Sequence, residues 1–472
     1  MKTPGSDLAD LPIHELAPRI AAGEVSPREL VSACLARIEA ADARLHAFVE
    51  VYREEALLAA EAAERAIRAG ARLGALHGIP IGLKDLLEME GRVTTFGSST
   101  RAGQRSTVTA AAVERLRAAG MIALGKTHMV EFAMGGWGTN PSMGTPWNPW
   151  DANVHRVPGG SSSGSAVAVA AGLVPAAIGS DTGGSVRIPS SFCGLVGLKV
   201  TAGRIPNHGV LALSETLDTL GPMTRSVEDA ALIFHALNGP DPRDAATQDA
   251  ARLDPIPALR RGVRGLRLAM MPVSDLEGLQ PEVATLYRRA VETLAGLGAH
   301  VEEVPPPFDF AGMQRHAGVI IASEGYEALG AFVEDQSLAL DPAVRKRLIA
   351  GKDFSAADYV AARKHMRAAR AQIAEALDDF DALLTPTTPI SAIPVAEVDE
   401  GALPHSRFTR AANYLGLCGL AVPAGLTPAG LPASLQIIGK PFAEAKVLRI
   451  GWAYEQAVAP LPRLDRAAWF AS

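Results

Sequence analysis

Cysteine is scarce in this chain of 472 residues, and its scarcity excludes two kinds of structure. Only Cys34, Cys193 and Cys418 occur. They lie too far apart in the sequence for a CxxC metal clamp or for a disulfide framework. We therefore predict no metal site, and the composition fits a reducing compartment.

Long hydrophobic runs are also missing. The longest apolar stretches are broken by Gly, Pro or Ser well short of the length of a membrane span. The first 19 residues are interrupted by Pro and acidic residues and offer no apolar run for a signal peptide. We predict a cytoplasmic protein without a membrane partner.

An excess of basic residues is the third absence. The 45 basic and 51 acidic side chains give a formal net charge of -6. Such a balance provides no electrostatic footprint for nucleic acid or for an anionic membrane. We therefore predict a small-molecule partner and no nucleic acid. The sequence does not determine the oligomeric state, for which a homodimer is an analogy only.

The residues that are present describe a globular α/β protein. The apolar fraction of 48% and the charged fraction of 20% are ordinary for such proteins. Ser26, Pro27 and Glu29 form a capping-box pattern that predicts the start of a helix. Further helices are predicted at about residues 54–68 and 227–237, and they alternate with apolar segments typical of strands.

Residues 158–199 contain two clusters of Gly and Ser, at 159–165 and 181–185, joined by a small apolar helix. Small residues let a substrate approach main-chain N–H groups closely. Ser185 follows Thr182, Gly183 and Gly184, an order that suits an oxyanion hole. A tight structural turn contains the same types of residue, so the pattern alone leaves both interpretations open.

Two other segments carry candidate site residues. Residues 78–85 predict a buried strand that delivers Lys84 at its C-terminal end, although most lysines are simply solvated. The loop at residues 131–144 is a connection or the rim of a pocket. Its candidates for substrate contact are Met134, Gly135, Gly136 and Trp137.

Two common chemistries do not fit these residues. The chain has no G-x-S-x-G elbow with a matching His, so a serine nucleophile would need a different base. The segment GGSSSGSA lacks the Lys that a P-loop places before its Ser or Thr. A nucleotide site is therefore not predicted, and no cofactor is expected.

Several motifs carry a specific resemblance. They are GGSSSGSAVAVAAGLVPAAIGSDTGGSVRIPSSFCGLVGLK, GIPIGLKD, GKTHMVEFAMG, LDTLGPMTRSVEDAA, LLTPTTP and GLPASLQIIGKPFAE. Together they closely resemble the amidase signature family of serine hydrolases over about residues 26–237 and 380–456. The stretch between these two parts is what varies among members of the family.

The resemblance implies a fold and an arrangement of segments. It implies an α/β fold in which a large central mixed β-sheet is covered by helices on both faces. We expect a single domain over residues 1–472. Within it, 1–75 is an N-terminal helical segment, 78–237 the core with the catalytic residues, 245–380 a variable region that shapes the substrate pocket, and 380–472 a return to the sheet.

The resemblance also assigns roles to individual residues. It implies a Ser–cis-Ser–Lys triad with Ser185 as nucleophile, Ser161 as bridging serine and Lys84 as base. The oxyanion hole would be the main-chain N–H groups of Thr182, Gly183, Gly184 and Ser185, with Asp181 and Arg187 bracing the loop. A base at neutral pH requires a shift of about three units from the ordinary lysine pKa of ~10.4, which burial can supply.

The predicted activity is hydrolysis of a linear carboxamide through a Ser185 acyl-enzyme, with release of a carboxylate and ammonia or an amine. Met134 and Trp137 suggest an apolar or aromatic acyl pocket. Alternatives are the glutaminase subunit of a tRNA-dependent amidotransferase, an esterase or carbamate hydrolase, a cysteine-type amidase using Cys193, and a non-enzymatic binding protein.

Overall fold

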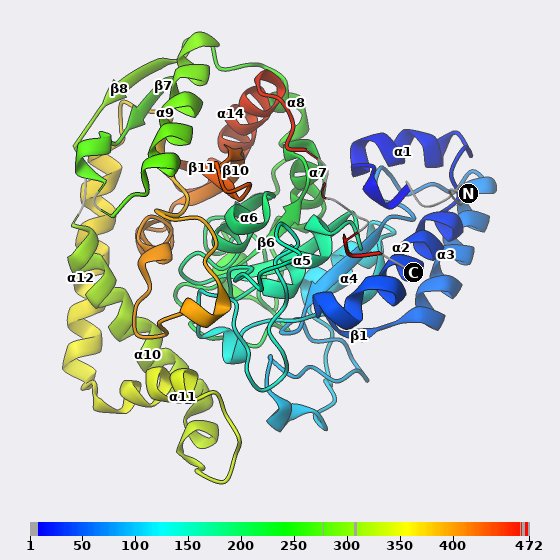
Figure 1. Cartoon of the computed structure of the whole chain (residues 1–472), viewed down its shortest axis with the longest axis horizontal. Helices are drawn as coiled ribbons and strands as arrows, with labels where there is room; N and C mark the ends of the chain where they lie inside the picture. Colours follow the sequence, from blue (N-terminus) through cyan, green and yellow to red (C-terminus); the bar gives the residue numbers. More distant parts are fainter. Residues whose placement is uncertain (1–7, 277, 306–308, 463, 465–467, 471–472) are drawn as a thin grey trace.

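The computed structural model describes residues 8–276, 278–305, 309–462, 464 and 468–470. Residues 1–7, which belong to the N-terminal stretch considered above, lie outside the described residues. The described ranges form one eleven-stranded β-sheet and fourteen α-helices around it (Figure 1). The predicted fold class, a large mixed sheet covered by helices, is confirmed.

The strands follow one another across the sheet in an order that differs from their order in the chain. From one edge to the other they are β1 (Phe48–Val51), β3 (Ile122–Thr127), β2 (Pro80–Lys84), β4 (Ala176–Asp181), β6 (Thr219–Thr224), β5 (Val196–Lys199), β10 (Cys418–Leu426), β11 (Pro432–Gly439), β9 (Ala382–Pro386), β7 (Arg267–Met270) and β8 (His300–Glu303). The pairs β2–β3, β2–β4, β7–β8 and β7–β9 are parallel, and the other neighbours are antiparallel.

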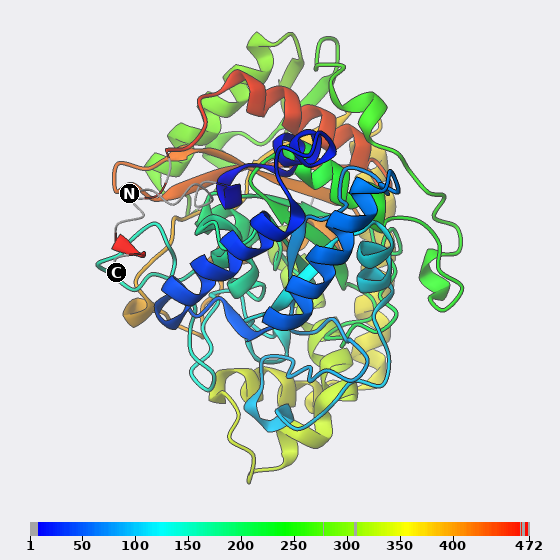
Figure 2. The same ribbon diagram turned by 90° about the vertical axis from the view of Figure 1, so that its right-hand side faces the viewer.

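The helices gather at the two ends of the sheet and over its centre (Figure 1). The N-terminal group is α1 (Ile13–Ala21), α2 (Pro27–Leu45), α3 (Arg53–Arg68) and α4 (Ala111–Ala118). The central group is α5 (Ser163–Ala170), α6 (Arg187–Cys193), α7 (Val227–Leu237), α13 (Arg410–Tyr414) and α14 (Glu444–Ala457). The remaining helices are α8 (Ile256–Leu259), α9 (Pro281–Gly296), α10 (Phe310–Glu334), α11 (Pro342–Ile349) and α12 (Ala356–Ala376). Figure 2 shows α2 and α3 side by side on the N-terminal side of the sheet.

Local sequence signals explain where several of these elements begin. Ser26 caps α2, because its hydroxyl accepts the N–H of Glu29 while the Glu29 carboxylate accepts the N–H of Ser26. Ser226 caps α7, whose bounds are those predicted. No helix in the described part of the chain is long and apolar enough to cross a membrane.

The C-terminal ends of β2 and β4 bring distant segments of the chain together. Strands β2 and β4 are parallel neighbours, with Leu83 opposite Ile178. Parallel strands have their C-terminal ends on the same side of the sheet, so Lys84 at the end of β2 lies near Ser180 and Asp181 at the end of β4. The predicted strand thus ends with Lys84 beside the C-terminal end of β4, where the serine clusters lie.

The segment predicted to vary, residues 245–380, contributes to two separate parts of the molecule. Strands β7 and β8 extend the sheet at the edge opposite β1, while α10 and α11 lie toward one end of the molecule (Figure 1). Helix α10 packs against α11, α12 and α13. The division of the chain into functional segments stays a prediction.

Candidate active site

Lys84 lies in the interior, in contact with two serine hydroxyls. Its Nζ donates to Ser161 Oγ at 2.7 Å and to Ser180 Oγ at 2.8 Å, and its side chain is fully buried. Burial disfavours the ammonium form and lowers the pKa of Lys84 to about 7, although Asp218 and Asp181 act from a distance in the opposite direction. At neutral pH a large fraction of this amine is therefore uncharged.

Two other lysines are equally buried but differently held. Lys126 Nζ donates to the carbonyl of Leu87 at 2.6 Å and lies 3.4 Å from an Asp85 carboxylate oxygen. Lys199 Nζ donates to the carbonyls of Val200 and Leu417. Lys126 Nζ also donates to the Thr94 hydroxyl at 2.9 Å, so a hydroxyl is only one of its three partners. A carbonyl oxygen has no proton to release, whereas a hydroxyl can accept one proton and release another. Of these three lysines, only Lys84 contacts hydroxyls alone.

Ser161 comes from the loop that precedes α5. The peptide bond between Gly160 and Ser161 is cis, as the resemblance implied. Helix α5 packs against both β2 and β4, and this contact holds the loop over the ends of these strands. The hydroxyl of Ser161 thereby contacts the Lys84 amine at the C-terminal end of β2.

Ser185 lies in the loop between β4 and α6, with 7% of its surface exposed. Within the described residues its hydroxyl has no hydrogen bond to Ser161 or to any other group. The structure therefore joins Lys84 to Ser161 by a hydrogen bond and shows no hydrogen bond between Ser161 and Ser185.

A buried ion pair holds this loop. Arg187 donates to both carboxylate oxygens of Asp181, at 3.0 and 2.9 Å, and also to Gln436 and Asn413. Burial alone would raise the pKa of Asp181, but the Arg187 guanidinium outweighs it and brings the value to about 2. The predicted bracing contacts of Asp181 and Arg187 are thus present.

The N–H groups of the loop do not all remain available. Gly184 donates its N–H to Asp181 at 2.7 Å, so this predicted member of the oxyanion hole is already engaged. In the described chain, the N–H groups of Thr182, Gly183 and Ser185 donate to no protein acceptor. Gly184 has a φ of +134°, and a Cβ there would lie 2.2 Å from Thr409 Oγ1, so the close approach requires glycine.

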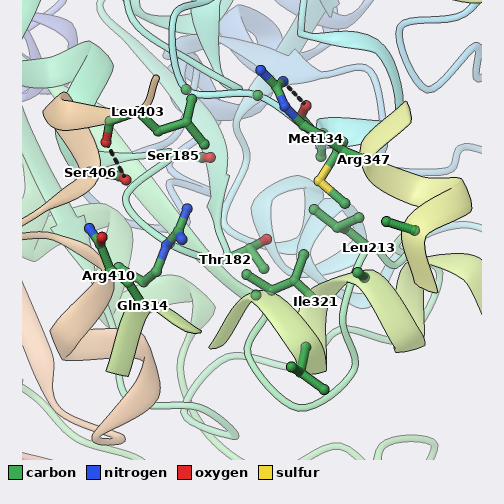
Figure 3. Close-up of a pocket in the computed structure, with 18 of the residues that line it drawn as sticks. Met134, Thr182, Ser185, Leu213, Gln314, Ile321, Arg347, Leu403, Ser406 and Arg410 are labelled. Atoms are coloured by element: carbon green, nitrogen blue, oxygen red, sulfur yellow. Dashed lines mark hydrogen bonds between the residues drawn. The ribbon is translucent and has the colours of Figure 1, made fainter. Parts of the chain in front are cut away.

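A cavity of about 390 Å³ opens beside Ser185 (Figure 3). Its apolar side includes Met134, Leu213 and Ile321, whereas Ser406, Gln314 and Arg410 lie on the same side as Ser185. The predicted contact residues Met134, Gly135 and Gly136 also line it, together with Thr182 and Gly183. Four segments far apart in the chain, around residues 134, 183, 320 and 406, therefore meet at one space.

Trp137 is not among the residues that line this cavity. It belongs to a small buried cluster with Val157 and Phe192, and its Nε1 donates to the carbonyls of Asp399 and Ala402. Its ring packs 4.1 Å from the ring of His405, which does line the cavity. The structure thus gives Trp137 a supporting position behind His405, and an aromatic wall formed by Trp137 is not seen.

Cys193, the alternative nucleophile, lies away from this cavity. It is buried at the end of α6, its Sγ donates to the carbonyl of Pro158, and burial raises the pKa of its thiol far above the ordinary value. A nucleophilic cysteine needs an accessible thiolate. The geometry does not support the cysteine-type alternative.

Sequence reasoning missed three groups at this site. Ser180 is the second partner of Lys84, and Asp218 accepts a hydrogen bond from the Thr182 hydroxyl. Arg410 lines the cavity from the first turn of α13. The strand end could have drawn attention to Ser180, and Asp218 lies in the motif LDTLGPMTRSVEDAA, but nothing in the sequence places Asp218 beside Thr182 or marks Arg410.

Comparison with known proteins gives a consistent result. The family model Amidase matches residues 29–448. A protein of Geobacter metallireducens, named as one of the subunits of glutamyl-tRNA(Gln) amidotransferase, is 38% identical, with 96% of this chain and 98% of that protein covered. Proteins of the same name from other bacteria are 36–39% identical to this chain.

Solved structures agree with the fold. One, described as a vestigial protein complex that reveals the origins of an s-triazine catabolic enzyme, has a TM-score of 0.89 and 32% identity, covering 96% of this chain and 100% of that one. The native peptide amidase of Stenotrophomonas maltophilia has a TM-score of 0.85 and 32% identity, covering 98% and 100%. This chain is similar to both over nearly its full length.

The predicted partners need correction. We expected a small molecule alone and no nucleic acid, yet the relatives above are named as subunits of an amidotransferase, and that name includes a glutamyl-tRNA. The prediction was wrong because it used the net charge of -6. A net charge sums over the whole surface, so it excludes neither assembly with other subunits nor a local contact.

Replacing Arg187 by Met should strongly destabilise the fold. The variant leaves the Asp181 carboxylate buried without its counter-ion, which typically costs about 3–5 kcal/mol. Urea denaturation measures this change in the free energy of unfolding. Arg65→Met is the control, because Arg65 pairs with Glu61 on an exposed helix surface and should change stability by less than about 0.5 kcal/mol. Equal stability of the two variants would contradict the bracing role.

Proposed function

Because the chain belongs to the amidase family, we propose that it hydrolyses a carboxamide by acyl transfer through Ser185. Family membership confirms the resemblance seen in the sequence and the predicted class of enzyme, a hydrolase of amide C–N bonds. The observation that carries the proposal is the buried Lys84 amine, 2.7 Å from the Ser161 hydroxyl and with a pKa of about 7.

The first half of the reaction forms an ester. Neutral Lys84 accepts the proton of Ser161, and Ser161 accepts that of Ser185, whose Oγ attacks the amide carbon. This requires Ser185 Oγ to come within hydrogen-bond distance of Ser161, a contact that commonly tightens only when substrate is bound. The oxyanion accepts hydrogen bonds from the free N–H groups of Thr182, Gly183 and Ser185.

The second half releases the products. The proton held by Lys84 returns through Ser161 to the nitrogen of the substrate, the C–N bond breaks, and ammonia or an amine leaves. Water then attacks the Ser185 ester while the same relay removes its proton, and the carboxylic acid departs. The balance is one amide and one water consumed for one carboxylic acid and one amine, with the enzyme unchanged.

The pH dependence tests Lys84 as the base. Only the neutral amine accepts a proton, so kcat/KM should rise about tenfold per pH unit below pH 7 and level off above it, since kcat/KM reports groups of the free enzyme. The measurement is kcat/KM for a neutral amide between pH 5 and pH 9. A profile that is flat across pH 6–8 would contradict the assignment.

Single substitutions test the relay. Ser185→Ala should abolish turnover, and Ser161→Ala and Lys84→Ala should each lower kcat by orders of magnitude, because each removes one transfer of the proton. Ser190→Ala is a matched control, since this buried hydroxyl on α6 has no partner among the described residues and lies outside the cavity. Labelling by a fluorophosphonate should be lost in Ser185→Ala and retained in Ser190→Ala.

The relatives favour a second candidate function, in which the same reaction serves a partner. Their shared name is that of one of the amidotransferase subunits, and they match this chain at 36–39% identity over at least 93% of its length. In that setting the chain would be a glutaminase subunit that releases ammonia for its partner. This setting is better supported than a free-standing amidase, although other amidases also match.

Isolation from its own cells distinguishes these settings. If the chain is such a subunit, ammonia release from glutamine should be at least tenfold faster in the fraction where it co-elutes with a partner than after separation, and mixing should restore it. Ser185→Ala carried through the same steps supplies the blank. Equal glutaminase rates before and after separation would favour the free-standing enzyme.

A further inference from the structure

The cavity beside Ser185 contains cations and no anion. Among the described residues that line it there is no Asp and no Glu, but there are three arginines, Arg315, Arg347 and Arg410. Two of them are accounted for by their surroundings. Arg315 is exposed to solvent, and Arg347 pairs with Glu400 at 2.6 Å and donates to the carbonyl of Met134.

Arg410 has no such partner. Within the described part of the chain its guanidinium makes no hydrogen bond and no ion pair, and its Nε is buried. Among the described residues, the one charged group that acts on its pKa is the cationic Arg347. An arginine stays protonated in proteins, so its charge faces the cavity without compensation. Arg410 is partly exposed, and an anionic ligand in the cavity would supply the counter-ion that the described residues do not.

The position of Arg410 relates this charge to the reacting group. A Cβ placed on Gly183 would lie 3.4 Å from Arg410 Nε, so the side chain lies beside the loop that lines the cavity with Gly183 and Ser185. Figure 3 shows Arg410 and Gln314 on the same side of the cavity as Ser185 and Ser406. A substrate whose carbonyl lies at Ser185 therefore presents its acyl substituent to this guanidinium.

We propose that Arg410 binds a carboxylate on the acyl part of the substrate, and that the preferred substrates are amides that carry a carboxylate without a neighbouring ammonium group. The inference rests on the proposed hydrolysis at Ser185 and names its substrate class. A guanidinium matches a carboxylate in a two-point contact, and the open donors of Arg410 provide that contact.

The second part of this proposal follows from the other charges. An α-ammonium next to the carboxylate would need an acceptor with negative charge, and no described carboxylate lines the cavity. Glu400, outside the lining, is engaged by Arg347 and by the hydroxyl of Thr139. His405 lines the cavity, and its pKa is lowered to about 3 by burial and by two arginines, so it is neutral. An ammonium would thus lie among cations, so the charges of the cavity count against glutamine, although the names of the relatives favour a glutaminase setting.

Three amides of similar shape test both parts. Glutaramate, the monoamide of glutaric acid, carries the carboxylate alone; glutamine adds the ammonium; pentanamide has neither. We expect kcat/KM for glutaramate to exceed that for pentanamide by about 10- to 100-fold, the worth of a charge-assisted contact. We expect glutamine to be at least tenfold poorer than glutaramate.

Substitutions attribute the preference to Arg410. In Arg410→Gln the ratio of kcat/KM for glutaramate over pentanamide should fall about 10- to 100-fold, mainly through KM, and Arg410→Lys should fall between that variant and the original. Arg407→Gln is the control, because it removes the same charge from the same segment at a residue that does not line the cavity. Its ratio should change less than about threefold.

Each outcome decides one point. Equal rates for glutaramate and pentanamide, or an unchanged ratio in Arg410→Gln, would overturn the carboxylate site. A preference for glutamine over glutaramate would overturn the exclusion of the ammonium and favour the glutaminase setting. If the protein hydrolysed none of the amides, the proposed function would fail by itself. Calorimetric binding of glutarate, present in the original protein and lost in Arg410→Gln, would still support the site, and its absence from both would overturn it.

Discussion

The site depends on a buried lysine, Lys84, that no carboxylate of the described residues contacts. A carboxylate in ion-pair contact would hold the Lys84 amine in its charged form, and the fold prevents this although Asp181 and Asp218 are both near enough to influence its pKa. Each of them is engaged elsewhere. Asp181 accepts from Arg187 and from the N–H of Gly184, and Asp218 accepts from the Thr182 hydroxyl. The serine hydroxyls are left as the partners of Lys84.

The same engagement of Asp181 also fixes the loop that carries the nucleophile. Arg187 reaches from α6 to Gln436 on β11 and to Asn413 on α13, so one guanidinium connects the loop to strands and helices more than 200 residues away in the chain. These contacts keep the Asp181 carboxylate from pairing with Lys84, and the same carboxylate accepts the N–H of Gly184. Of the four N–H groups predicted to form an oxyanion hole, that of Gly184 is thus engaged, and those of Thr182, Gly183 and Ser185 donate to no acceptor among the described residues.

The sequence was most informative where the signal is local. The capping box at Ser26, the bounds of α7 and the strand that ends at Lys84 follow from spacing over a few residues. The family resemblance supplied the cis bond before Ser161. Contacts between distant segments were not accessible in this way. From its place in a glycine-rich loop, Trp137 is predicted to lie at the rim of the pocket. In the structure it packs behind His405, which lies more than 260 residues further along the chain.

The residues proposed to select the substrate and those proposed to react come from different parts of the chain. Similarity to the family therefore bears on the reaction more than on the choice of substrate. The groups proposed to react, Lys84, Ser161 and Ser185, lie on strands and loops that contain the family motifs. The charged part of the cavity comes from α13 and its neighbours, where Arg410 lies. Proteins with nearly the same fold as this one bear names that refer to different amides. Family membership therefore bears on the kind of bond that is broken, whereas the proposed selection of acyl groups rests on Arg410.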